Sequence, residues 1–143
     1  MVMENFQLAA QLQTDSIEIG DFPLCRVLLI NDSQFPWCVL VPRREDVREI
    51  YQLAEVDRQQ LMTESCMLAE TLNHLFEPDK INIAAIGNLV PQLHIHHVAR
   101  YRGDKAWPAP IWGKFPPLPY SAAQSSARVM QLQTALRHAL LTM

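Results

Sequence analysis

The fold is decided by the stretch Gly87-Asn88-Leu89-Val90-Pro91-Gln92-Leu93-His94-Ile95-His96-His97-Val98-Ala99-Arg100, which holds three of the chain's five histidines. Its opening glycine and asparagine predict a turn. The residues from 93 to 98 then predict a strand. Because side chains on a strand point alternately to its two faces, the stretch divides into two sets. Gln92, His94 and His96 share one face, and Leu93, Ile95 and His97 share the other.

Two imidazoles side by side at a sheet surface, next to the long amide of Gln92, form a polar row that core packing alone seldom requires. Histidine titrates near neutral pH, so a neutral imidazole can attack phosphorus while its neighbour handles a proton. We therefore expect a catalytic site at His94 and His96, with a structural polar cluster as the alternative. For His97, on the apolar face, packing is the expected role.

The flanking sequence predicts an α+β fold, with an antiparallel sheet of about five strands and a main helix on one face. Strands are expected at 16–21, 25–30, 37–41, 81–86 and 93–98, and short helices near 4–13 and 47–53. The main helix is expected from the N-cap Asp57 to Phe76, with Val56 and Leu61 as a hydrophobic staple. A final helix begins at Ser121, where Gln124 completes a capping box.

A proline-rich segment separates the last predicted strand from the final helix. Five of the ten prolines lie between Pro108 and Pro119. That density excludes a helix interior or a central strand, so an ordered loop pinned by aromatic side chains is expected. Trp107 and Trp112 either anchor this loop on the core or form a platform for a nucleotide base, and anchoring is favoured.

The 143 residues predict a single domain over 1–143, with a core at about 16–102 and a C-terminal extension at about 103–143. The net charge of −3 gives no basic field for a nucleic-acid polymer. There is no signal-peptide pattern and no apolar run of transmembrane length, so we expect a cytoplasmic protein without membrane contact. The odd set Cys25, Cys38 and Cys66 predicts buried reduced thiols.

The histidine stretch resembles the signature strand of the histidine triad superfamily. In that family three histidines alternate with apolar residues, after a glycine–glutamine pair. Gly87 and Arg100 set the register, which places Gln92, His94 and His96 at the three triad positions. Residues 31–44 are also similar to the family's pair of strands. The resemblance covers roughly residues 16–102 and implies a HIT-like fold and a homodimer.

The resemblance also implies a role for each matching residue. His94 is the nucleophile that forms a transient nucleotidyl-imidazole, and His96 contacts the phosphate and helps protonate or orient the leaving group. Contacts with phosphate or nucleotide are implied for Gln92, Asn88, and Asn31 or Asp32. Arg100, just beyond the strand, either steers phosphate or pairs with Asp104.

The implied function is a nucleotide hydrolase or nucleotidyl transferase without a cofactor or metal. Dinucleoside polyphosphates, phosphoramidates and adenylated compounds are the implied substrates. The chain departs from the pattern at Gln92, which cannot act as an acid, and at Leu89, where a hydroxyl residue is common. These departures keep open a nucleotide-binding or sensor module without catalysis. A zinc site on His-x-His is the other alternative, although the further ligands that would complete it are lacking.

Overall fold

The computed structural model describes residues 6–142 and has an antiparallel five-stranded sheet at its centre, in the order β1-β2-β3-β5-β4. The strands are β1 (Ser16–Asp21), β2 (Cys25–Ile30), β3 (Trp37–Pro42), β4 (Lys80–Ala84) and β5 (Ile95–Arg100). The helices are α1 (Ala10–Asp15), the short 3-10 helix η1 (Ile50–Gln52), α2 (Glu55–Phe76) and α3 (Ala122–Leu136). This arrangement confirms the predicted α+β class.

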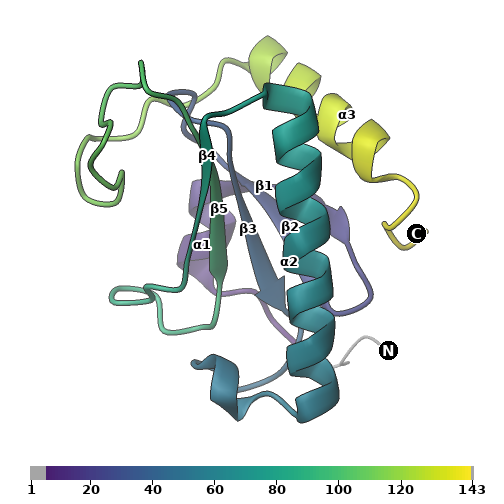
Figure 1. Cartoon of the computed structure of the whole chain (residues 1–143). Helices are drawn as coiled ribbons and strands as arrows, with labels where there is room; N and C mark the ends of the chain where they lie inside the picture. Colours follow the sequence, from purple (N-terminus) through teal and green to yellow (C-terminus); the bar gives the residue numbers. More distant parts are fainter. Residues whose placement is uncertain (1–5, 143) are drawn as a thin grey trace.

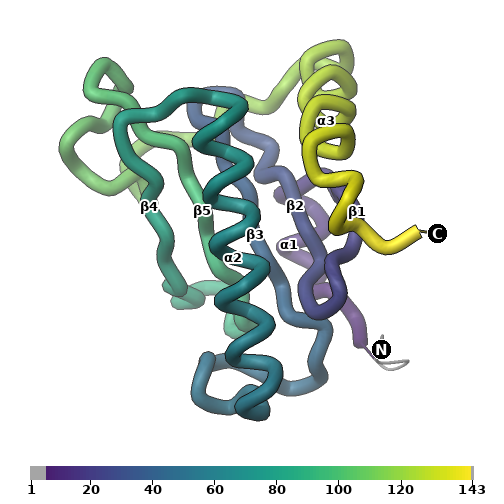
Figure 2. The backbone as a smooth tube through the Cα atoms, turned by 45° about the vertical axis from the view of Figure 1, so that its right-hand side comes forward, coloured from purple at the N-terminus to yellow at the C-terminus, as the bar shows by residue number. Residues whose placement is uncertain are grey.

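The two faces of the sheet are covered by different elements. Helices α2 and α3 lie on one face, and α1 lies behind the other (Figure 1). The tube view shows α3 beside α2, near the β1 edge of the sheet (Figure 2). The main core fills the space between the sheet and the two long helices, and its fully buried members include Leu40, Leu68, Leu72 and Leu132. A smaller cluster on the opposite face joins Leu12 of α1 to β2 and β3.

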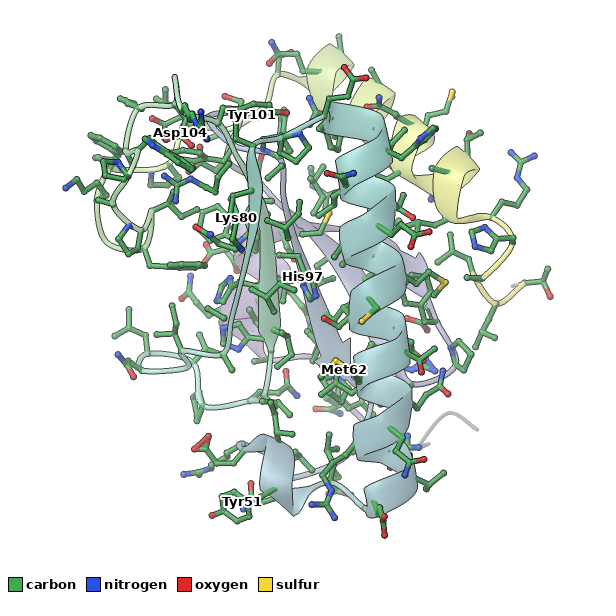
Figure 3. The ribbon with its side chains drawn as sticks, in the orientation of Figure 1. Tyr51, Met62, Lys80, His97, Tyr101 and Asp104 are labelled. Atoms are coloured by element: carbon green, nitrogen blue, oxygen red, sulfur yellow. The ribbon has the colours of Figure 1, made fainter. Side chains whose placement is uncertain are left out.

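His97 joins β5 to α2 on the core face of the sheet (Figure 3). Its Nδ1 lies 3.0 Å from the carbonyl oxygen of Ile95, which can only accept, so Nδ1 carries the ring proton. Its Nε2 lies 2.7 Å from the Ser65 hydroxyl and accepts a hydrogen bond from it. Burial lowers the pKa of His97 to about 4, so the ring stays neutral at pH 7. The predicted packing role of His97 is confirmed.

The proline-rich segment is an ordered loop, as predicted, and its first turn is built around a buried ion pair. The Arg100 guanidinium donates to the Asp104 carboxylate at 2.7 Å and to the Ala109 carbonyl at 2.8 Å. Burial by itself would raise the pKa of Asp104. The bonds from Arg100 and from three backbone N–H groups outweigh it and hold that pKa at about 2. Figure 3 shows Asp104 within this loop, beside the sheet and away from α2.

The start of α2 differs from the prediction. The helix begins at Glu55, before the expected cap, and its N-cap residue makes no side-chain hydrogen bond. Asp57 lies inside the first turn and pairs with Arg44 at 2.7 Å. Val56 is 71% exposed, so it forms no staple. An ion pair to the loop after β3 therefore replaces the local capping that the sequence suggested.

Other local predictions need smaller corrections. The helix expected at 47–53 is reduced to η1, and β5 begins two residues later than predicted. The first helix begins at Ala10 rather than near residue 4, although residues 4 and 5 lie outside the described part. Cys66 is exposed on α2, whereas Cys25 and Cys38 are buried as expected. At the C-terminus, the predicted capping box of Ser121 and Gln124 is confirmed.

We predict that the protein loses stability between pH 6.5 and pH 4 because His97 stays neutral in the fold. Its pKa is lowered, so the unfolded chain binds a proton first as the pH falls, and the free energy of unfolding decreases in this window. The contribution of His97 alone should lower the free energy of unfolding by about 2 kcal/mol between pH 7 and pH 5. Urea unfolding of the wild type and of His97→Gln at pH 7 and pH 5 measures this change in the free energy of unfolding.

The His97→Gln variant should be less stable at pH 7 but less sensitive to pH. His74→Gln, on α2, is the matched control and should keep the wild-type pH dependence. An unchanged pH dependence in His97→Gln would contradict the neutral buried imidazole.

Candidate functional site

His94 and His96 lie side by side on the sheet face opposite α2. Their ring centroids are 4.9 Å apart, with the ring planes at 70°. His94 immediately precedes β5 and His96 is the second residue of the strand, so the pleat turns both rings to one face. They are 6% and 7% exposed, respectively. The structure thus brings together the two residues on which the sequence-based hypothesis rests.

The tautomer of His94 follows from a hydrogen bond within its own segment. Nδ1 of His94 lies 2.7 Å from the carbonyl oxygen of Gln92. A carbonyl oxygen only accepts, so Nδ1 carries the proton of the neutral ring and the lone pair is on Nε2. That is the state in which an imidazole acts as a nucleophile.

The opposite tautomer is found at His96. The indole Nε1–H of Trp37, on β3, donates to Nδ1 of His96 at 3.0 Å. Nδ1 is therefore the acceptor, and the proton of the neutral ring is on Nε2. Burial, followed by the neighbouring His94 and His97, lowers the pKa of His96 to about 3. At pH 7 this residue is a neutral hydrogen-bond donor.

Neither Nε2 atom of the two histidines makes a hydrogen bond to another residue within 6–142. Within residues 6–142, the buried side-chain polar atoms that lack a partner are on Arg43, Trp112 and Tyr120. His94 lines the cavity that is described next. The site presents one lone pair and one N–H group next to each other.

A cavity of about 210 Å³ adjoins His94. The loop between β4 and β5 forms one wall, and the segment before η1 supplies Arg48. Gly87 has φ of +60°, a left-handed conformation that favours glycine, and it shapes the turn of this loop. No carboxylate in the described part of the chain lies within ion-pair distance of the Arg48 guanidinium. This cavity thus combines His94 with the unpaired cation of Arg48, and Glu49 also lines it.

A second cavity, of about 310 Å³, has in its wall Trp37, the residue whose indole bonds to Nδ1 of His96. Asn31 and Asp32, at the end of β2, also line it. The Oδ1 atoms of both residues hold the C-terminal segment: that of Asn31 accepts from Tyr120 N at 2.9 Å, and that of Asp32 accepts from Leu118 N at 3.4 Å as well as from the nearby Gln34 N. Among the described residues, no hydrogen bond is made to Oδ2 of Asp32. The two residues therefore support the roof of the cavity as well as lining it.

Gln92 has a structural partner that the sequence did not reveal. Its amide oxygen accepts from the backbone N–H of Ala9 at 2.8 Å, and its amide nitrogen donates to the Gln7 carbonyl at 2.9 Å. The side chain at the first triad position therefore fastens the segment before α1 to the site. Asn88 lies exposed on the loop between β4 and β5 and is not among the residues that line the cavity of His94, although its neighbour Gly87 is.

Arg100 lies away from both cavities. It is 1% exposed, and its nitrogens donate to Asp104, Asn82 and Ala109. Of the two roles expected for it, the pairing with Asp104 is the one observed. A phosphate would have to displace these bonds, so this side chain stabilises the loop instead of facing a ligand.

Two residues at the site were missed by sequence reasoning, Trp37 and Arg48. Trp37 belongs to a strand separated from the histidines by more than fifty residues, so only the pairing of β3 with β5 shows the contact. Trp112 was noted in the sequence, and its ring packs edge-on against His96 with centroids 5.5 Å apart. Two indole rings therefore enclose His96.

Two further structural observations concern metal binding and membrane-spanning helices. Within residues 6–142, no group of three or more His, Cys, Asp and Glu side chains is placed to hold a metal ion. In the same range, no helix has both the length and the apolar character needed to cross a membrane.

A family model described as the HIT domain matches residues 11–103. Among solved structures, a histidine triad protein from Marinobacter aquaeolei VT8 is 48% identical, with 94% of this chain and 98% of that chain covered and a TM-score of 0.92. One from Bradyrhizobium japonicum is 46% identical, with coverages of 95% and 98% and a TM-score of 0.87. One from Sinorhizobium meliloti 1021 is 37% identical, with coverages of 94% and 99% and a TM-score of 0.91. A search of curated proteins gave no match. The chain therefore belongs to the histidine triad (HIT) family.

Proposed function

We propose that this protein is a nucleotide-phosphate hydrolase or nucleotidyl transferase that works through a covalent nucleotidyl intermediate on His94. The hydrogen bond from Nδ1 of His94 to the Gln92 carbonyl carries the proposal, because it leaves an unprotonated and unpartnered Nε2 at a cavity. In the first step this lone pair attacks phosphorus and the leaving group departs. Water or another acceptor then takes the nucleotidyl group.

The two cavities support an assignment for the parts of the substrate. A phosphate chain carries negative charge, and the cavity beside His94 contains the unpaired cation of Arg48. The larger cavity has apolar walls from Ile30, Phe35 and Trp37, and a free acceptor on Asp32. Such a lining suits a base and a ribose hydroxyl. Dinucleoside polyphosphates and adenylated compounds are therefore the proposed substrates.

Three further residues take modified roles in this proposal. Gln92 shapes the site by holding the segment at Gln7 and Ala9, and it would reach phosphate only by giving up those bonds. Asn88 remains a proposed phosphate contact because its exposed amide is on the loop that borders the cavity. His96 donates a hydrogen bond from its Nε2–H group to the substrate.

One observation favours a second candidate function, a nucleotide-binding module without turnover. Gln92 offers no acidic proton and its amide is already bonded to the backbone. Such a module would bind nucleotides tightly and leave His94 unmodified. The experiment that follows separates the two candidates.

We predict that His94 becomes nucleotidylated when the protein meets a panel of adenylated and dinucleotide substrates. Rapid denaturation followed by peptide mass spectrometry should locate the adduct. His94→Ala should lose at least about a thousandfold in rate, since it lacks the nucleophile. His74→Ala, on α2, is the matched control and should react like the wild type. Full activity in His94→Ala would contradict the covalent mechanism, and tight binding without adduct or turnover would favour the binding module.

Arg48 is predicted to bind the phosphate chain. Arg48→Gln should raise KM about tenfold and leave kcat nearly unchanged, because a charged contact made equally in the ground and transition states is lost. Arg58→Gln, which removes an exposed arginine from the first turns of α2, is the control. Steady-state kinetics at two salt concentrations measure the effect. Equal KM values for Arg48→Gln and the wild type would contradict the assignment.

We also propose a homodimer that pairs through the free edge of β4. This strand ends the sheet, so one row of its backbone groups has no partner strand among the described residues. Ile83, which is on β4, is 51% exposed. Light scattering after gel filtration should give the mass of a dimer, and Ile83→Lys should shift it to the monomer. Met130→Lys, on α3, should remain dimeric, whereas a monomeric wild type at micromolar concentration would contradict the proposal.

A further inference from the structure

The bond between Trp37 and His96 restricts the protonation state of His96. An indole N–H is only a donor, and it points at Nδ1 of His96 over 3.0 Å. If Nδ1 took up a proton, two N–H groups would face each other in a buried site. His96 therefore cannot become an imidazolium while this hydrogen bond lasts.

Within residues 6–142, no carboxylate lies within ion-pair distance of His96. The rings of Trp37 and Trp112 enclose it, with centroids at 5.7 and 5.5 Å. Its neighbours across the sheet are Val39 on β3 and Ala84 on β4. The titratable groups that act on it are His94 and His97, both from its own segment, and both oppose its protonation.

On this basis we propose that Trp37 is a positioning residue that keeps His96 as a neutral hydrogen-bond donor. The site is thereby restricted to nucleotidyl donors whose leaving group departs as a stable anion. Carboxylates and phosphates are such leaving groups. Amines are not, because they must gain a proton as they leave. The inference rests on the proposed function and narrows its substrate class to anhydrides, leaving phosphoramidates as poor substrates.

The proposed reaction balances without a proton from the protein. The Nε2 lone pair of His94 forms a bond to phosphorus, and the bond from phosphorus to the leaving oxygen breaks with its electron pair on that oxygen. His96 donates its Nε2–H as a hydrogen bond to the substrate and keeps the proton. In the second step water bonds to phosphorus and releases a proton to solvent. The phosphorus–nitrogen bond breaks, and its electron pair returns to His94.

Substrates that share one nucleotidyl group and differ in the leaving group test this proposal. Single-turnover formation of the His94 adduct would be measured for an acyl adenylate, for an adenosine phosphoanhydride and for adenosine 5′-phosphoramidate. In the wild type, we expect both anhydrides to react at least about a hundredfold faster than the phosphoramidate, the scale of a missing general acid. Comparable rates for all three would overturn the inference and leave the proposed function standing. The absence of any adduct would instead overturn the proposed function.

Two variants of Trp37 connect this selectivity to the hydrogen bond. Trp37→Phe keeps an aromatic ring and removes the donor, and Trp37→Gln adds an oxygen that could accept from a protonated Nδ1. The ratio of the anhydride rate to the phosphoramidate rate should fall about tenfold or more in Trp37→Gln. Trp112→Phe, which keeps the second ring against His96, is the matched control and should retain the wild-type preference. An unchanged preference in Trp37→Gln would contradict the role of Trp37.

A spectroscopic measurement on the wild type keeps the proposal testable if the Trp37 variants do not fold. The ¹⁵N resonances of His96 should show a protonated Nε2 and an unprotonated Nδ1 throughout pH 5 to 8. An imidazolium in this range, or the opposite tautomer, would overturn the proposal.

Discussion

The site depends on the place of β5 in the sheet, between β3 and β4. Its backbone is bonded on both sides, which fixes His96 opposite Val39 on one neighbour and Ala84 on the other. A slip of one residue would exchange the faces of the strand and move His96 into the core beneath α2. The double pairing therefore keeps the catalytic candidate on one face and His97 on the other.

Three adjacent histidines reach different chemical states because each has a different partner. The Gln92 carbonyl leaves a lone pair on Nε2 of His94, whereas the Trp37 indole leaves a proton on Nε2 of His96. On the core face, His97 has both of its nitrogens bonded. One residue type thus supplies an unprotonated nitrogen, a hydrogen-bond donor and a bridge between β5 and α2 within four positions of the chain.

The C-terminal segment completes the site from outside the sheet. Its first turn is fixed by the bonds of Arg100 to Asp104 and Ala109, and it places Trp112 against His96. Further along, Asn31 holds Tyr120, and the residues between form the roof of the larger cavity. Asn31 and Asp32, for which the family resemblance implied contacts with the nucleotide, thus also hold this roof in place.

The sequence by itself determined the fold class, most of the strands, and the common face of His94 and His96, because alternation and turn residues act over a few positions. It misplaced the start of α2, where Asp57 pairs with the distant Arg44 instead of capping the helix. Only the tertiary structure decided the partners of the side chains: the indole of Trp37 on His96, the backbone of Ala9 on Gln92, and Asp104 on Arg100. The first two of these contacts join segments far apart in the chain, and local patterns carry no information about such pairings. The protonation states of the histidines depend on these partners, so the chemistry of the site was decided by the packing of strands and loops.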